Sequence, residues 1–252
     1  MTDTLFAAEA GEGPQTLVLL HGFAGSHRVW DRVGRALAPQ ARIIAYDLPG
    51  HAGSLHFPGA GPAKVAVRAL LDDLARRNIE KAHVAGHSMG GAIAALMALA
   101  EPARVASLTL FAPGGFGAEI NGRLLRRYAE ARDPGDIRNA IEAMSGWSHT
   151  VSEQAVSAYA AERAMPGQTE ALVGISKIIA RDGVQGAIPR DRLAGLAMPV
   201  SVVWGTLDTV LPRHQSDGLP PLFALHSLPG AGHMLIDEAP DLAIELIRRQ
   251  LR

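Results

Sequence analysis

The chain has 252 residues, of which 48% are apolar, and this length supports one large hydrophobic core and a single domain. Its 24 basic and 25 acidic residues nearly balance, without a long run of one sign, so the charge pattern that would bind nucleic acid or an anionic membrane is missing. Cysteine is absent, which excludes disulfides, thiol nucleophiles and thiolate metal ligands.

The N-terminal segment does not have the pattern of a secretory signal, because it carries acidic residues and no basic segment before an apolar one. The longest apolar stretch, residues 89–100, is well short of the roughly 20 residues that a membrane-spanning helix needs. We therefore expect a cytoplasmic protein without a membrane anchor.

Short apolar runs alternate with segments of helical spacing along the chain. Runs that are apolar on both faces are typical of parallel strands covered by helices on both sides. Strands are predicted over residues 16–20, 42–46, 82–86, 108–112, 200–204 and 223–228. Helices are predicted over residues 29–38, 64–77, 89–100 and 240–251. The alternation indicates an α/β fold with a doubly wound, mostly parallel sheet.

One long interval, residues 114–199, interrupts this alternation. It contains no convincing strand and has several helical stretches separated by the turn sequences DPGD, MPGQ and RDGV. A loop of this length is uncommon in a compact domain, so an inserted helical cap is expected. The core would then comprise residues 1–113 and 200–252.

The segment GHSMG, residues 86–90, follows a predicted strand and begins a predicted helix. In this context G-x-S-x-G indicates a nucleophile elbow, a strained turn that raises the serine hydroxyl above the sheet. Side chains at Gly86 or Gly90 would collide with neighbouring backbone. The alternatives are a phosphate-binding turn and a helix-capping serine, but neither G-x-G-x-x-G nor G-x-x-x-x-G-K-[ST] occurs. Ser88 is the candidate nucleophile.

A serine nucleophile needs a base and a carboxylate that orients the base. His233 lies in a glycine-rich loop between the last predicted strand and the last predicted helix, and Asp208 follows the preceding strand. The alternatives are an exposed loop histidine and a turn-forming aspartate. The order Ser88, Asp208, His233 is the one expected when the nucleophile stands on such an elbow.

Backbone N–H groups for the developing oxyanion are predicted at Phe23 and Met89. Phe23 follows His21 and Gly22 at the end of an early strand, and Met89 follows the nucleophile. Taken alone, His21 and Gly22 are equally compatible with an ordinary strand-end turn. His21, Gly22 and His87 are candidates for the substrate pocket beside the nucleophile.

Four separated motifs, LLHGFAGS, YDLPGHAGS, GHSMGG and the pair WGTLD with GAGHM, resemble those of the α/β-hydrolase superfamily over nearly the full chain. The resemblance implies a fold of that type and hydrolysis by Ser88, Asp208 and His233. The segment LTLFAPGGFGAEING is also similar to the hydrolase-like domains of acetoin dehydrogenase acyltransferase components. Because no lipoyl-bearing segment is present, that similarity suggests ancestry and not acyl transfer.

Some positions depart from the patterns of this superfamily. Ala24 and Ala52 stand where many members have glycine, in H-G-F-G-G and D-L-P-G-H-G-x-S, which predicts a slightly different loop shape near the oxyanion site. Members that cleave haloalkanes or epoxides use an aspartate nucleophile, and Ser88 argues against both. Members that hydrolyse C–C bonds often have Asn before the serine, where this chain has His87.

Larger side chains of the predicted cap are candidates to line the pocket, namely Met144, Trp147, His149, Tyr159 and Met165. The alternative is that they form the small core of the cap itself. The arginines of residues 121–132 either bias the site toward acidic substrates or form a solvated helix face.

The sequence predicts a serine hydrolase that cleaves a small-molecule carboxylic ester through an acyl-enzyme on Ser88. One alternative is that the same triad acts on a thioester, amide, lactone or C–C bond. Another is a binding module that keeps the fold without catalysis. The mechanism requires no metal and no cofactor motif is visible, and the sequence makes no prediction of the oligomeric state.

Overall fold

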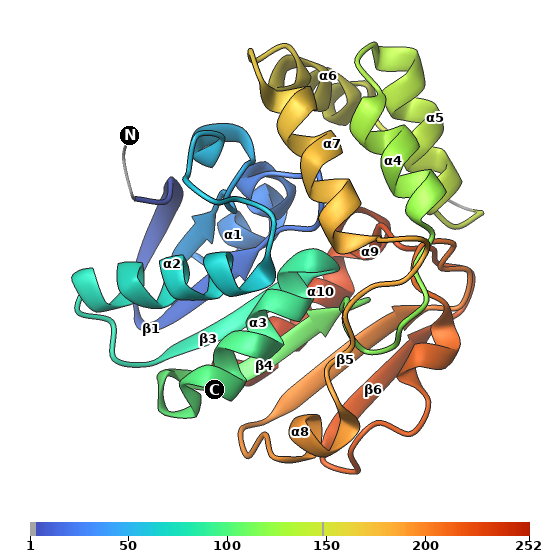
Figure 1. The fold of residues 1–252 in the computed structure, drawn as a ribbon. Helices are drawn as coiled ribbons and strands as arrows, with labels where there is room; N and C mark the ends of the chain where they lie inside the picture. Colours follow the sequence, from blue (N-terminus) through green and yellow to red (C-terminus); the bar gives the residue numbers. More distant parts are fainter. Residues whose placement is uncertain (1–3, 148) are drawn as a thin grey trace.

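The computed structural model describes residues 4–147 and 149–252. Within these residues the strands form one mostly parallel sheet in the order β2-β1-β3-β4-β5-β6 (Figure 1). The strands are β1 (Ala7–Leu20), β2 (Ala41–Tyr46), β3 (Ala82–His87), β4 (Val105–Phe111), β5 (Val200–Gly205) and β6 (Phe223–Leu228). The predicted fold class is confirmed, and each predicted strand overlaps an observed one.

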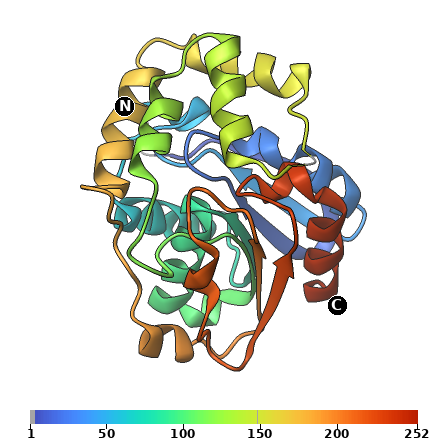
Figure 2. The same cartoon turned by 90° about the vertical axis from the view of Figure 1, so that its right-hand side faces the viewer.

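Helices cover both faces of the sheet. The helices α2 (Ala63–Arg76) and α3 (Met89–Ala100) pack together on one face, and α1 (Asp31–Leu37) and α10 (Pro240–Gln250) pack together on the other (Figures 1 and 2). Strands covered on both sides must be apolar on both sides, and every residue of β5 is buried. Short 3-10 helices are η1 (His27–Trp30), η2 (Ala52–Ser54), η3 (Pro102–Arg104) and η4 (Arg213–Ser216). Within the described ranges, no helix combines the length and the apolar character that crossing a bilayer demands.

The first half of β1 extends beyond the predicted strand and pairs along the outer edge of β2. Ala7–Ala10 pair with β2 in an antiparallel register, whereas Thr16–Leu20 pair with it in a parallel register. The chain therefore folds back around the start of β2. Gly11 makes the turn with a φ of 75°. A Cβ at Gly11 or Gly13 would overlap the backbone at the start of β2, so glycine is needed there. We refer to Ala7–Ala10 as the outer arm.

The inserted segment places four helices over the carboxyl ends of the strands (Figure 1). These helices are α4 (Gly122–Glu130), α5 (Pro134–Met144), α6 (Glu153–Arg163) and α7 (Gln168–Ile179). A fifth helix, α8 (Arg190–Ala194), lies apart from them and packs on α3, while α9 (Leu235–Glu238) precedes α10. The predicted cap range, 114–199, therefore includes a stretch after α7 that returns along the core.

Turn residues begin three of the cap helices. Asn121, Asp133 and Ser152 each accept a hydrogen bond from the backbone N–H three residues further along, at the starts of α4, α5 and α6. Pro134 occupies the first position of α5, where its missing N–H leaves no helical bond unmade. Capping residues thus set where these three cap helices start, and Asp133 and Pro134 belong to the predicted turn DPGD.

Candidate active site

Ser88 stands at the turn between β3 and α3, with a φ of 52° and a ψ of −115°. Such a conformation strains a non-glycine residue by roughly 1–3 kcal/mol. A Cβ at Gly86 would overlap the carbonyl of Gly90, and a Cβ at Gly90 would overlap the carbonyl of Leu20. The two glycines therefore make room for the sharp turn that lifts the Ser88 hydroxyl off the sheet.

The side chains of Ser88, His233 and Asp208 form a chain of hydrogen bonds. Oγ of Ser88 lies 2.9 Å from Nε2 of His233, and Nδ1 of His233 lies 2.8 Å from Oδ2 of Asp208. The other carboxylate oxygen of Asp208 accepts hydrogen bonds from the N–H groups of Val210 and Leu211, at 2.9 and 2.8 Å. With Nδ1–H donating to Asp208, Nε2 is free to accept the hydroxyl proton of Ser88. This is the geometry that a nucleophile, a base and an orienting acid require.

Parallel strands bring these three residues together, because their carboxyl ends meet at one edge of the sheet. Ser88 follows β3, Asp208 follows β5 and His233 follows β6. Only 4% of the His233 side chain and 0% of the Asp208 side chain are exposed. Water therefore competes little with the hydrogen bond between them.

Phe23 and Met89, predicted to form the oxyanion hole, line the same cavity as Ser88. Met89 is the first residue of α3, where N–H groups have no partner within the helix. In the part of the chain that the structure describes, neither of these two N–H groups donates to a protein acceptor. Both remain available to a negatively charged oxygen beside Ser88.

Ala24 and Ala52 take left-handed backbone conformations, with φ of 60° and 40°. The Ala24 N–H donates to Nε2 of His51 at 3.2 Å, and the Ala52 N–H donates to Oε1 of Gln168 on α7 at 2.8 Å. Glycine takes this conformation freely, whereas an alanine is strained by about 1–2 kcal/mol. The different loop shape expected at these two positions is therefore a strained backbone conformation. Hydrogen bonds to His51 and to Gln168 of the cap hold it in place.

His21 supports the backbone and does not line a cavity, which corrects its predicted place in the pocket. The residue is 0% exposed. Its Nε2 accepts a hydrogen bond from the Leu48 N–H at 2.9 Å, and its Nδ1–H donates to the Gly22 carbonyl at 2.7 Å. Burial lowers its pKa, which keeps the ring neutral and able to play both roles. His21, which stands beside Gly22 of the motif, therefore fixes the conformation of the loop after β1.

His87 and His51 are also buried and neutral. Burial lowers the pKa of each to about 3. The Nε2–H of His87 donates to the backbone carbonyl of His233 at 2.7 Å, which fixes the loop that carries the base. His87, the residue before the nucleophile, thus connects the elbow to the third member of the triad.

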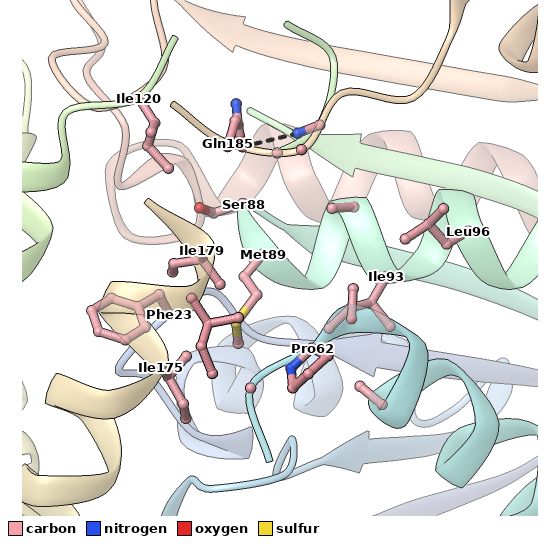
Figure 3. Close-up of a pocket in the computed structure, with 18 of the residues that line it drawn as sticks. Phe23, Pro62, Ser88, Met89, Ile93, Leu96, Ile120, Ile175, Ile179 and Gln185 are labelled. Carbon is pink, nitrogen blue, oxygen red and sulfur yellow. Dashed lines mark hydrogen bonds between the residues drawn. The ribbon is translucent and has the colours of Figure 1, made fainter. Parts of the chain in front are cut away.

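The larger of two cavities beside Ser88 measures about 380 Å³ and lies between the core and the cap (Figure 3). The residues that shape it in Figure 3 are mostly apolar and include Phe23, Met89, Ile93, Ile120, Ile175 and Ile179. Gly50 and Gly61 allow α7 to lie against the core loop, because a Cβ at either position would overlap Ile175 or Ile178. An apolar part of a substrate fits such a lining.

The isoleucines of α7 were not predicted as pocket residues. Their spacing along the helix is the only signal in the sequence, and the same spacing is typical of a helix that packs within the cap. The sequence pattern alone cannot distinguish a helix that lines a cavity from a helix that packs within a core.

The smaller cavity, of about 30 Å³, lies on the His233 side of Ser88. Four predicted pocket residues line it: Gly22, His87, Met144 and Tyr159. Tyr128 of α4 and Asp237 of α9 also line it and were not predicted. In the described ranges, no group of three or more His, Asp and Glu side chains is arranged to hold a metal ion.

The prediction that Trp147, His149 and Met165 line the pocket is wrong. None of them lines either cavity, and Trp147 is 87% exposed. The loop after α5 is fastened at Gly146 and carries Trp147 to the surface. Met165 follows α6 and is 38% exposed. Side-chain size alone does not fix the direction of a loop.

Glu238 joins the cap to the loop that carries His233, and sequence reasoning missed it. Its Oε2 accepts hydrogen bonds from the N–H groups of Gly146 and Gly232, both at 2.8 Å, and its Oε1 accepts one from the Met234 N–H at 3.0 Å. The His233 N–H in turn donates to a backbone carbonyl at the end of α5, at 2.7 Å. The position of the base therefore depends on the cap.

Comparison with known proteins agrees with this fold. Residues 15–240 match a family described as alpha/beta hydrolase fold. The chain belongs to the α/β-hydrolase family. The resemblance carried by the four sequence motifs is thus confirmed.

Named curated relatives of this α/β hydrolase include proteins of two kinds. It is 33% identical over 230 residues to the dihydrolipoyllysine-residue acetyltransferase component of the acetoin cleaving system of Cupriavidus necator, covering 90% of this chain and 61% of that protein. The chain therefore spans about three fifths of the length of these relatives. It is 31% identical over 215 residues to the pimeloyl-[acyl-carrier protein] methyl ester esterase of Aeromonas hydrophila, covering 81% of this chain and 80% of that protein.

Solved structures share the fold of this α/β hydrolase at low sequence identity. A meta-cleavage product hydrolase from Pseudomonas fluorescens IP01 matches it with a TM-score of 0.85 and 21% identity, over 98% of this chain and 93% of that chain. At this identity the likeness shows the fold alone.

Proposed function

We propose that this α/β hydrolase is a serine esterase that cleaves a small-molecule carboxylic ester through an acyl-enzyme on Ser88. One observation carries the proposal. Ser88, His233 and Asp208 are joined by hydrogen bonds at the end of an apolar cavity, beside two backbone N–H groups without a protein partner among the described residues.

The reaction follows from these contacts. Nε2 of His233 takes the proton of the Ser88 hydroxyl as Oγ attacks the ester carbonyl, and Asp208 stabilises the imidazolium that forms. The N–H groups of Phe23 and Met89 stabilise the oxyanion, and losing one such donor raises the barrier by about 2.7–4 kcal/mol. His233 then protonates the leaving alcohol. Water, activated by the same ring, releases the acid and restores Ser88.

The name of the Aeromonas hydrophila relative supports an ester as the scissile bond, because that protein is named as an ester hydrolase. The acetoin-system relatives are named as acetyltransferase components, but this chain covers only about three fifths of their length. We therefore favour hydrolysis of an ester over acyl transfer, and over cleavage of a thioester, amide, lactone or C–C bond by the same triad.

An alkyl fluorophosphonate tests the proposal, because it labels a serine whose hydroxyl is activated by a neighbouring base. We expect a single label on Ser88, located by mass spectrometry, and none in Ser88→Ala. Hydrolysis of methyl octanoate should fall by about 10⁶-fold in Ser88→Ala. The control Ser157→Ala, which removes an exposed serine of α6, should keep wild-type activity. An unlabelled Ser88 in folded protein, or activity that survives Ser88→Ala, would overturn the proposal.

A further inference from the structure

Two cavities of different size meet at Ser88. The larger measures about 380 Å³ and the smaller about 30 Å³. Phe23, Ser88 and Leu125 line both cavities, so the two are adjacent on either side of the nucleophile. An ester whose carbonyl reaches Ser88 must place its acid half on one side and its alcohol half on the other.

The position of His233 decides which half lies on which side. His233 lines the smaller cavity and not the larger one, and its Nε2 must reach the leaving oxygen to protonate it. Met89, whose N–H stabilises the oxyanion of the acyl group, lines only the larger cavity. The alcohol half therefore lies in the smaller cavity and the acyl chain in the larger one.

The smaller cavity limits the alcohol. Its volume of about 30 Å³ is less than a tenth of the 380 Å³ of the larger cavity. Tyr128 and Met144 in its wall are 2% exposed, and Tyr159 is 7% exposed. The Tyr128 ring packs edge-on against Tyr159 and Phe23, at centroid distances of 6.3 and 6.5 Å. An alcohol much larger than methanol would have to displace these packed side chains.

The outlet of the smaller cavity also disfavours a long alkyl group. Among the described residues, Asp237 is the one exposed residue in the lining of this cavity, which therefore reaches solvent beside it, and burial raises the pKa of its carboxyl to about 6. An alkyl chain that extended past this point would desolvate the carboxyl without offering it a hydrogen bond. A small hydroxylic alcohol leaves by the same route without that penalty.

The larger cavity favours an apolar acyl chain. Among the residues that the structure describes, Ser88 and Gln185 are the only polar side chains in its lining. The Gln185 amide is already engaged, because Oε1 accepts from the Gly115 N–H at 3.1 Å (Figure 3) and Nε2 donates to the Glu119 carbonyl at 3.3 Å. A charge buried there would find no partner. Ile178 lines this cavity and is 51% exposed, so a long acyl chain has an opening beside α7.

Building on the esterase function proposed above, we propose that the substrates are esters of methanol-sized alcohols with an apolar acyl chain, and that Met144 and Tyr159 set the size limit of the alcohol. The acid half has room and an opening. The alcohol half has little room, and its outlet passes the Asp237 carboxyl.

Octanoate esters of methanol, ethanol, butanol and hexanol test this inference. We expect kcat/KM for methyl octanoate to exceed that for butyl octanoate by about tenfold or more, as is usual when a pocket lacks room for added methylenes. Met144→Ala and Tyr159→Ala each enlarge the smaller cavity and should lower this ratio by about fivefold or more. The carbonyl that accepts from His233 belongs to the Met144 backbone and is kept in Met144→Ala.

The matched control is Ile179→Ala, which enlarges the larger cavity. It should change the dependence on acyl chain length and leave the methyl-to-butyl ratio as it is. Equal turnover of methyl and butyl octanoate by a wild-type protein that the phosphonate labels on Ser88 would overturn this inference alone. Faster hydrolysis of octyl acetate than of methyl octanoate would overturn the assignment of the two halves. No turnover of any ester, with Ser88 unlabelled, would overturn the esterase function together with the inference.

Discussion

Removing the Glu238 carboxylate should weaken both the fold and the catalytic step. In Glu238→Ala the N–H groups of Gly146, Gly232 and Met234 lose their acceptor, and a buried donor left unpaired costs about 1–3 kcal/mol. Because Glu238 is half-buried, water replaces part of this loss, and we expect the free energy of unfolding to fall by about 3 kcal/mol. Glu238→Gln keeps one oxygen for Gly146 and Gly232, so the fall should be about 1 kcal/mol.

The same change should lower kcat, because Glu238 fixes the loop that carries His233. Displacing a catalytic group by about 1 Å costs about 100-fold in rate. We expect kcat for methyl octanoate to fall by about 10- to 100-fold in Glu238→Ala, with KM changed by less than about twofold and partial recovery in Glu238→Gln.

Urea denaturation and initial rates measured on the same samples check both effects. Glu245→Gln is the matched control, because Glu245 lies on α10 and its side chain is 54% exposed. A kcat within about twofold of wild type in folded Glu238→Ala would refute the reasoning, since the base would then hold its position without the carboxylate.

Two further predictions concern stability. Ala52→Gly should raise the free energy of unfolding by about 0.5–1 kcal/mol, because relief of left-handed strain outweighs the added chain entropy, and a loss in thermal or urea denaturation would contradict this. Burial lowers the pKa of His51 and His87 to about 3, so the folded state binds fewer protons than the unfolded state between about pH 3 and pH 6.5. Stability is therefore lost as pH falls, by about 2 kcal/mol for each histidine between pH 6.5 and 5. Urea denaturation against pH should show a shallower loss in His51→Gln, whereas exposed His56→Gln should leave the profile as it is.

The sequence predicts the sheet and the triad geometry well, because both depend on strands with strong local signals. The residues of β5 are apolar on both faces, which few other elements tolerate. Ser88, Asp208 and His233 each lie within a few residues of the end of a strand, and parallel strands bring such positions to one edge. No knowledge of side-chain packing is needed for that step.

The features that were missed depend on contacts between distant segments. The outer arm is half-buried to exposed and becomes a strand only because β2 lies beside it. Trp147 has the size of a pocket residue, but its direction is set by the bond between Gly146 and Glu238, which are 92 positions apart. The φ of Ala52 is likewise held by Gln168 of the cap. Contacts of this kind leave no local pattern.

The outer arm also bears on how two molecules of this protein would associate. It is a short edge strand, and its Glu9 pairs with Arg42 and Arg77. Short charged edges resist pairing with a strand from another molecule. At the opposite edge, β6 is the last strand of the sheet within the described residues and carries Leu225, which is 38% exposed, so this edge is less protected. Association through one exposed edge gives a dimer that cannot grow further. A chain without the outer arm would expose both edges of the sheet, and strand pairing at both edges would allow fibres to form.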